Sequence, residues 1–102
     1  MATNQPLIRS QEPKTASSCI EFAKAYLGRS GEKWGNARDL KPSVTKPYVG
    51  GLVLTDEGRF GHVAVITKIE GKTLYLIEGN WRPNEITTRT LVSDSLLIRG
   101  FR

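Results

Sequence analysis

The sequence predicts an α+β domain in which one short helix packs on an antiparallel sheet of about five strands. Residues 18–27 space their apolar side chains at helical intervals, between a start and a stop signal. From residue 49 onward, runs rich in β-branched residues alternate with turn-forming residues, which is typical of strands. A chain of 102 residues, 38% apolar and 25% charged, fits a single small globular domain.

The first 14 residues are polar, include Pro6 and Pro13, and are expected to form an extended arm ahead of a domain over residues 15–102. This stretch lacks the basic and then apolar layout of a secretory signal. No apolar run approaches the roughly 20 residues that span a bilayer, so no membrane insertion is expected.

The helix is expected to begin at Ser18-Cys19-Ile20-Glu21, which matches a capping box. Gly28 supplies the usual stop just past a helix end. Cys19 would then be the first helical residue, where unpaired N–H groups and the helix dipole favour a thiolate. Taken alone, the position also suits a small buried cysteine without a chemical role. The predicted apolar face holds Cys19, Phe22, Ala23, Tyr26 and Leu27.

The remaining elements follow from turn chemistry and β-branched runs. Residues 28–47 are rich in Gly, Lys, Ser and Pro and are expected to form a loop with one helical turn near residues 36–40. Five strands are expected after this loop. They cover residues 49–55, 62–69, 73–78, 86–92 and 96–101.

The hairpin of the second and third strands is expected to bring a histidine and a carboxylate together. A three-residue loop, 70–72, would place His62 opposite Asn80 and Glu78 diagonal to His62 on the same face. An imidazole beside a carboxylate and an amide is held in one tautomer, as a catalytic base must be. Taken separately, His62 could be an ordinary hydrogen-bonded sheet histidine and Glu78 a solvated strand-end charge.

These residues fall within a set of motifs that resembles the CHAP family, the cysteine- and histidine-dependent amidohydrolases/peptidases of the papain-like NlpC/P60 group. The resemblance covers about residues 16–101, and it rests on five motifs in the family's order. They are S-C-I-E-F at 18–22, W-G-N-A at 34–37, P-Y-V-G at 47–50, G-H-V-A at 61–64 and E-G-N-W at 78–81.

The resemblance implies a papain-like half-fold whose nucleophile helix packs on the sheet. It implies hydrolysis of an amide bond in peptidoglycan through a cysteine thioester, as an N-acetylmuramoyl-L-alanine amidase or a peptidoglycan endopeptidase. Carried over, Cys19 is the nucleophile, His62 the general base and then acid, and Glu78 the residue that orients His62. Asn80 could assist or replace Glu78.

Three further residues are candidates for contact with the substrate. Trp81 follows Asn80 directly and could stack on a sugar or peptide plane, and Trp34 is a second candidate; either tryptophan could instead be a core or rim aromatic. Many family members carry Gln directly before the cysteine, where it helps to form the oxyanion hole. This chain has Ser18 there, so the donor to the oxyanion is left open.

Composition limits the cofactors and partners. One cysteine and one histidine permit no intramolecular disulfide and no ordinary structural zinc site, so no metal or other cofactor is expected. The net charge of +5 favours anionic polymers such as wall glycopolymers, or simply aids solubility. Because neither an Arg-rich run nor paired RNP-like aromatic motifs occur, no nucleic-acid partner is expected. Bacterial peptidoglycan is the expected partner and a monomer the expected state.

Two other functions stay open at this point: a papain-like amidase or deamidase that acts on a protein, and a cell-wall-binding module without turnover. In the absence of a signal peptide, the protein is expected to be made in the cytoplasm. It would then reach the bacterial wall as a phage lysin, a virion-associated enzyme or an injected effector.

Overall fold

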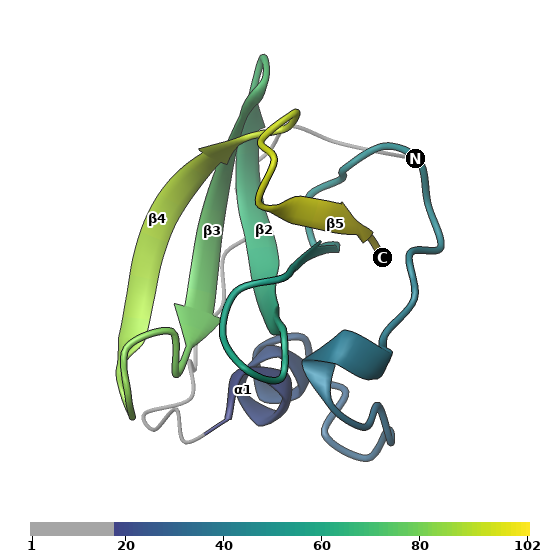
Figure 1. The fold of residues 1–102 in the computed structure, drawn as a ribbon, viewed down its shortest axis with the longest axis vertical. Helices are drawn as coiled ribbons and strands as arrows, with labels where there is room; N and C mark the ends of the chain where they lie inside the picture. Colours follow the sequence, from purple (N-terminus) through teal and green to yellow (C-terminus); the bar gives the residue numbers. More distant parts are fainter. Residues whose placement is uncertain (1–17) are drawn as a thin grey trace.

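The computed structural model describes residues 18–102, and the predicted arm over residues 1–14 lies outside this part. One helix lies beside the ends of strands of a curved, five-stranded antiparallel sheet (Figure 1). The strands are ordered β4-β3-β2-β1-β5. The predicted α+β class is confirmed. The elements are α1 (Cys19–Tyr26), the 3-10 helix η1 (Ala37–Asp39), β1 (Leu52–Thr55), β2 (His62–Glu70), β3 (Thr73–Gly79), β4 (Ile86–Val92) and β5 (Ile98–Phe101).

Helix α1 begins where the sequence predicts. The Ser18 side chain accepts a hydrogen bond of 3.2 Å from the Glu21 N–H, so Ser18 is the N-cap and Cys19 the first helical residue. The expected return bond from Glu21 to the cap does not form, since its carboxylate turns to Lys24, 3.4 Å away. The helix ends at Tyr26 with Leu27 as its C-cap, and Gly28 follows with a φ of 72°, a conformation that glycine adopts without strain.

The β2–β3 hairpin has a shorter loop than predicted, yet the predicted register holds deeper in the hairpin. Glu70 pairs with Thr73 across a two-residue loop, so the expected three-residue loop is wrong. A β-bulge at Thr67 then adds one residue to β2. Beyond the bulge, Val65 pairs with Ile77, as the predicted register requires. The shorter loop and the bulge each shift the strand register by one residue, in opposite directions. The predicted register is therefore restored before the strands reach His62.

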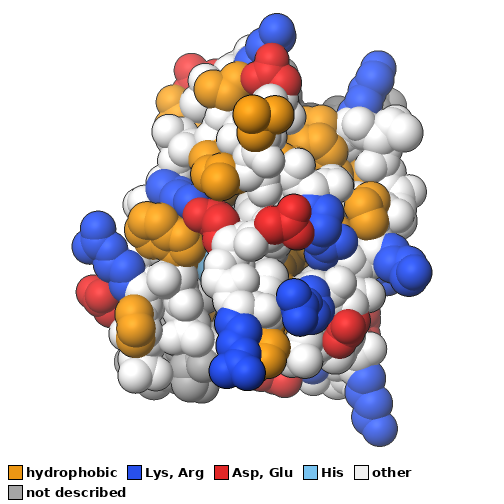
Figure 2. Space-filling view, viewed as in Figure 1, with side chains coloured by type: hydrophobic (Ala, Val, Ile, Leu, Met, Phe, Trp, Pro, Cys, Tyr) orange, Lys and Arg blue, Asp and Glu red, His pale blue; other side chains and the backbone are white. Residues whose placement is uncertain are grey.

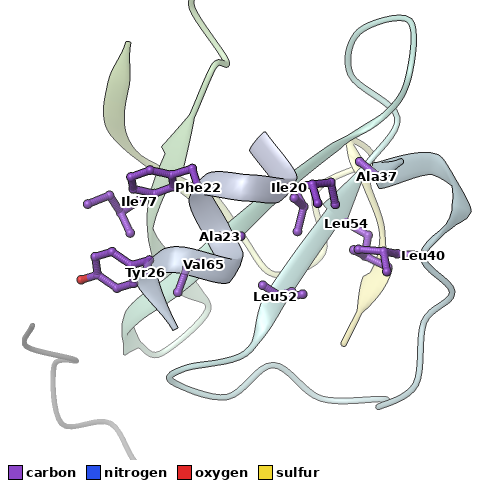
Figure 3. Packing of buried hydrophobic residues seen from close by; sticks show 11 residues of the cluster. Ile20, Phe22, Ala23, Tyr26, Ala37, Leu40, Leu52, Leu54, Val65 and Ile77 are labelled. Carbon is purple, nitrogen blue, oxygen red and sulfur yellow. The ribbon is translucent and has the colours of Figure 1, made fainter. Parts of the chain in front are cut away.

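The sheet carries apolar side chains on both faces. On one face, α1 packs over alternate residues of the strands, including Leu54, Val65 and Ile77 (Figure 3). Burial of each such side chain contributes roughly 1.5–3 kcal/mol, so this layer anchors α1 firmly to the sheet. The second cluster lies on the opposite face. Its buried members are Val53, Ala64, Ile66, Leu74, Leu76 and Phe101.

The first and last strands are shorter than predicted. β1 begins only at Leu52, because a turn precedes it. This turn is closed by a hydrogen bond of 2.9 Å from the Gly51 N–H to the Tyr48 carbonyl. β5 begins only at Ile98, because the Ile98 N–H donates to the Ser95 carbonyl and closes a second turn. These turns satisfy backbone groups locally, so β1 begins three residues and β5 two residues later than predicted.

Charged side chains are spread over the molecular face of Figure 2 rather than gathered in one patch. Lys and Arg side chains occur at several separate places on this face, with Asp and Glu between them. Within residues 18–102, the helices are too short to cross a membrane.

Candidate active site

Cys19, His62 and Glu78 come together at the start of α1. Cys19 is the first residue of α1 and His62 is the first residue of β2. Both line one cleft, in which the Cys19 side chain is close enough to the imidazole to raise its pKa. His62 Nε2 lies 2.7 Å from Glu78 Oε1. Because Nε2 is occupied by the carboxylate, Nδ1 is the ring nitrogen available to the sulfur. The three side chains thus form a chain from thiol to imidazole to carboxylate.

The imidazole is buried and held in its charged form. His62 is 4% exposed and Glu78 is fully buried. Burial alone lowers the pKa of an imidazole, but hydrogen bonds and negative charge from Cys19 and Glu78 outweigh it. Together they raise the pKa of His62 from 6.5 to about 9. An imidazolium in contact with a sulfur at a helix N-terminus stabilises negative charge on that sulfur.

A second layer of charge lies behind Glu78. Arg89 on β4 donates from Nε to Glu78 Oε2 over 2.8 Å and from Nη1 to Glu57 Oε2 over 2.9 Å. Hydrogen bonds from Arg89 lower the pKa of Glu57 to about 2 against the effect of burial, and Thr55 and Trp81 add to this shift. The Arg89 guanidinium also stacks over the Trp81 ring, 4.5 Å from its centroid. A continuous network therefore runs from the thiol to Trp81.

Cys19 and His62 border a cleft of about 490 Å³, which Glu57 and Trp81 also line. The start of α1 forms one side, and the β1–β2 loop, residues 56–61, forms another. This volume suits a small ligand or a short stretch of peptide or sugar. The lining residues are Ser18, Cys19, Ile20, Asn36, Ala37, Glu57, Gly58, Arg59, Phe60, Gly61, His62, Asn80 and Trp81.

Gly61 fixes the end of the β1–β2 loop just before His62. Its φ is 75°, and a Cβ atom at this position would lie 3.0 Å from the backbone nitrogen of Arg38. That nitrogen donates a hydrogen bond of 2.8 Å to the Phe60 carbonyl. The segment 36–39 and the loop are thereby held against each other, and the glycine that permits the close approach directly precedes His62.

The other predicted site residues have different positions. Ser18 and Asn80 line the cleft, but the Ser18 hydroxyl caps α1 and Asn80 Oδ1 accepts a hydrogen bond of 2.8 Å from the Asn84 N–H. Glu78, rather than Asn80, is the residue that hydrogen-bonds to His62. Trp81 lines the cleft and is 39% exposed. Trp34 does not line it and borders a separate pocket with Lys33 and Arg102, among others.

Several residues of the site carried no role in the sequence-based predictions. Glu57 and Arg89 connect the triad to Trp81, and Arg59 and Phe60 line the cleft beside His62. Arg89 follows Glu78 by 11 positions, and it reaches the carboxylate because β4 pairs with β3. The alternation of β4 places its odd-numbered residues on one face, but the sequence does not say which partner they meet. Within the described part of the chain, no His, Cys, Asp or Glu cluster is arranged to hold a metal ion.

A thiol at a helix N-terminus, in contact with an imidazole that a buried carboxylate holds, defines the cysteine- and histidine-dependent hydrolases as a class. Residues 10–80 match the CHAP domain. This match covers well over half of the chain, so the protein belongs to the CHAP family, whose members are generally cysteine- and histidine-dependent amidohydrolases. Neither a curated protein nor a solved structure matches the chain significantly.

The raised pKa of His62 predicts the pH range of activity. The imidazolium persists up to a pH of about 9, so we expect activity to fall with one deprotonation near that pH. The contribution of the charged ring to folding is present below its unfolded pKa of 6.5 and is lost as the pH rises through about 9.

A nuclear magnetic resonance titration measures this pKa directly, because His62 is the single histidine of the chain. The midpoint is expected near 9 in the wild type and lower in Cys19→Ala, in which one source of the shift is gone. A wild-type midpoint at or below 6.5 would contradict the ion-pair geometry.

Proposed function

We propose that this protein is a peptidoglycan hydrolase that cleaves an amide bond through a thioester on Cys19. The observation that carries the proposal is the contact of Cys19 with His62, with Glu78 bonded to the far side of the imidazole. The membership of the chain in the CHAP family supports the substrate class. We propose further that the helix and sheet form a papain-like half-fold.

The proposed reaction begins when the Cys19 sulfur attacks the carbonyl carbon of the scissile amide. The resulting oxyanion needs N–H donors, and α1 supplies two candidates. The backbone N–H groups of Cys19 and Ile20 stand in the first turn, where a helix offers them no carbonyl partner. We assign the oxyanion to these two backbone donors. The Ser18 hydroxyl is held at the helix cap, where its oxygen accepts a hydrogen bond from the Glu21 N–H.

His62 then gives its proton to the leaving amine, and the C–N bond breaks to leave an acyl thioester. In the second half, the neutral imidazole takes a proton from water, which attacks the thioester and releases the acid. Glu78 holds the ring so that Nδ1 faces the sulfur throughout. The substrate is bacterial peptidoglycan, and the enzyme works as a monomer on the wall.

Purified cell walls test the proposal. The wild type is expected to release soluble muropeptides and one new amino group for each bond cut, which mass spectrometry and amine labelling measure. Mass spectrometry of the products also separates an amidase, which frees the lactyl group from L-Ala, from an endopeptidase. Release of ammonia without chain cleavage would indicate a deamidase. Binding without any product would indicate a wall-binding module.

A further inference from the structure

The β1–β2 loop, residues 56–61, presents an arginine to the cleft from a well-held backbone. Near its start, the Glu57 carboxylate is bound by Arg89 and by Thr55 Oγ1, which lies 2.9 Å from Glu57 Oε1. At its end, the Phe60 carbonyl accepts a hydrogen bond from the Arg38 N–H. Arg59 lies between these two attachments and lines the cleft with its side chain exposed.

The charges that line the cleft differ in whether they already have partners. Glu57 is neutralised by Arg89 and also accepts a hydrogen bond of 3.2 Å from Trp81 Nε1. His62 is engaged by Cys19 and Glu78. Arg59, by contrast, forms no hydrogen bond or ion pair within residues 18–102. Its guanidinium lies over the Phe60 ring, 5.6 Å from the centroid. The cleft therefore offers one free positive charge and no free negative charge among its described residues.

We infer that Arg59 binds a carboxylate of the substrate beside the scissile amide. A guanidinium matches a carboxylate with two parallel N–H donors, and such charged hydrogen bonds are the strong ones. The exposed rings of Phe60 and Trp81, 55% and 39% exposed, give apolar contact on the same cleft. The site thus selects an acidic peptide.

This inference rests on the proposed function and narrows it. The stem peptide of peptidoglycan carries two kinds of carboxyl group near its amide bonds: the α-carboxyl of a γ-linked glutamate and the carboxyl at the peptide end. Both present the same chemistry to a guanidinium. Amidation of either group removes the charge while it preserves the shape, so the two sources can be tested separately.

The experiment uses three synthetic muropeptides: one with both carboxyls free, one amidated at the glutamate, and one amidated at the peptide end. For the wild type, amidation of the recognised carboxyl is expected to raise KM about tenfold, which corresponds to about 1.4 kcal/mol, with little change in kcat. In Arg59→Gln, the KM for the acidic substrate should rise by the same factor, and amidation should have no further effect.

Arg82→Gln is the matched control. Arg82 is also an exposed arginine stacked over an aromatic ring of the cleft, 5.7 Å from the Trp81 centroid, but it does not line the cleft. The Arg82→Gln substitution removes the same charge as Arg59→Gln, and this variant should keep the wild-type preference for the acidic muropeptide. Equal KM values for all three substrates, or an unchanged preference in Arg59→Gln, would overturn the inference and leave the hydrolase intact. If the wild type cleaves none of the three, the proposed function fails and the inference with it.

Discussion

Replacement of Cys19 by alanine is expected to abolish wall hydrolysis and to leave the fold intact. The rate should fall by a factor of at least about 10⁴, because no other group in the cleft can form the thioester. Cys19 is only partly buried, and α1 keeps its cap at Ser18 and its buried residues Phe22 and Tyr26. Release of muropeptides measures the first effect, and the circular dichroism spectrum and thermal midpoint measure the second.

The single cysteine provides a matched control for this prediction. A thiol-selective alkylating reagent has Cys19 as its single target in the wild type and no target in Cys19→Ala. Alkylation should therefore inactivate the wild type with one equivalent of label, and the alanine variant should take up none. Lysis that survives either treatment would show that the sulfur is not the nucleophile.

Replacement of Arg89 by leucine is expected to lower both stability and activity. Glu78 is fully buried and would lose its hydrogen bond of 2.8 Å from Arg89 Nε. Removal of one member of a buried ion pair leaves the other unpaired and costs about 3–5 kcal/mol. His62 still bonds to Glu78, so we expect a loss at the lower end of this range, measured by denaturant unfolding. Activity falls because the carboxylate that orients His62 is no longer anchored.

A double variant separates this electrostatic effect from lost packing. Glu78→Gln removes the buried charge, so in the Arg89→Leu background it should cost far less stability than in the wild type, or restore some. Activity should not recover, since a neutral amide holds the imidazolium less well. If the two losses simply add, the interaction of Arg89 with Glu78 contributes little.

Arg99→Leu serves as the control for the loss of a large cationic side chain. Arg99 is buried to a similar degree, with 22% of its side chain exposed against 16% for Arg89. It donates to the carbonyls of Leu40 and Ala37 rather than to a buried carboxylate. The loss of stability caused by Arg99→Leu should therefore be the same with or without Glu78→Gln.

The helix and most of the strands could be predicted because their signals are local. The Ser18 hydroxyl caps α1 within three residues of chain, and Gly28 stops it one turn after Lys24. The strand of residues 86–92 has the predicted bounds because alternation and flanking turns delimit it. The register of the β2–β3 hairpin is harder to predict from local signals. Neither the shorter loop nor the bulge at Thr67 has a distinct sequence signal, and the prediction held at Val65 because the two displacements cancel.

The sequence by itself determined the chemistry available to this protein: one thiol at the start of a helix, one imidazole at the start of a strand, and a carboxylate on the neighbouring strand. Helix caps, turn residues and the alternation of apolar and polar side chains predict these features, and each of these signals acts over a few residues. Only the tertiary structure decided what surrounds them. It placed β4 beside β3 so that Arg89 reaches Glu78 and Glu57. It left Arg59 without a hydrogen-bond or ion-pair partner among residues 18–102, and it put Trp34 outside the cleft. Such contacts join residues far apart in the chain. The packing energy of the whole domain selects these contacts, and no local sequence pattern encodes them.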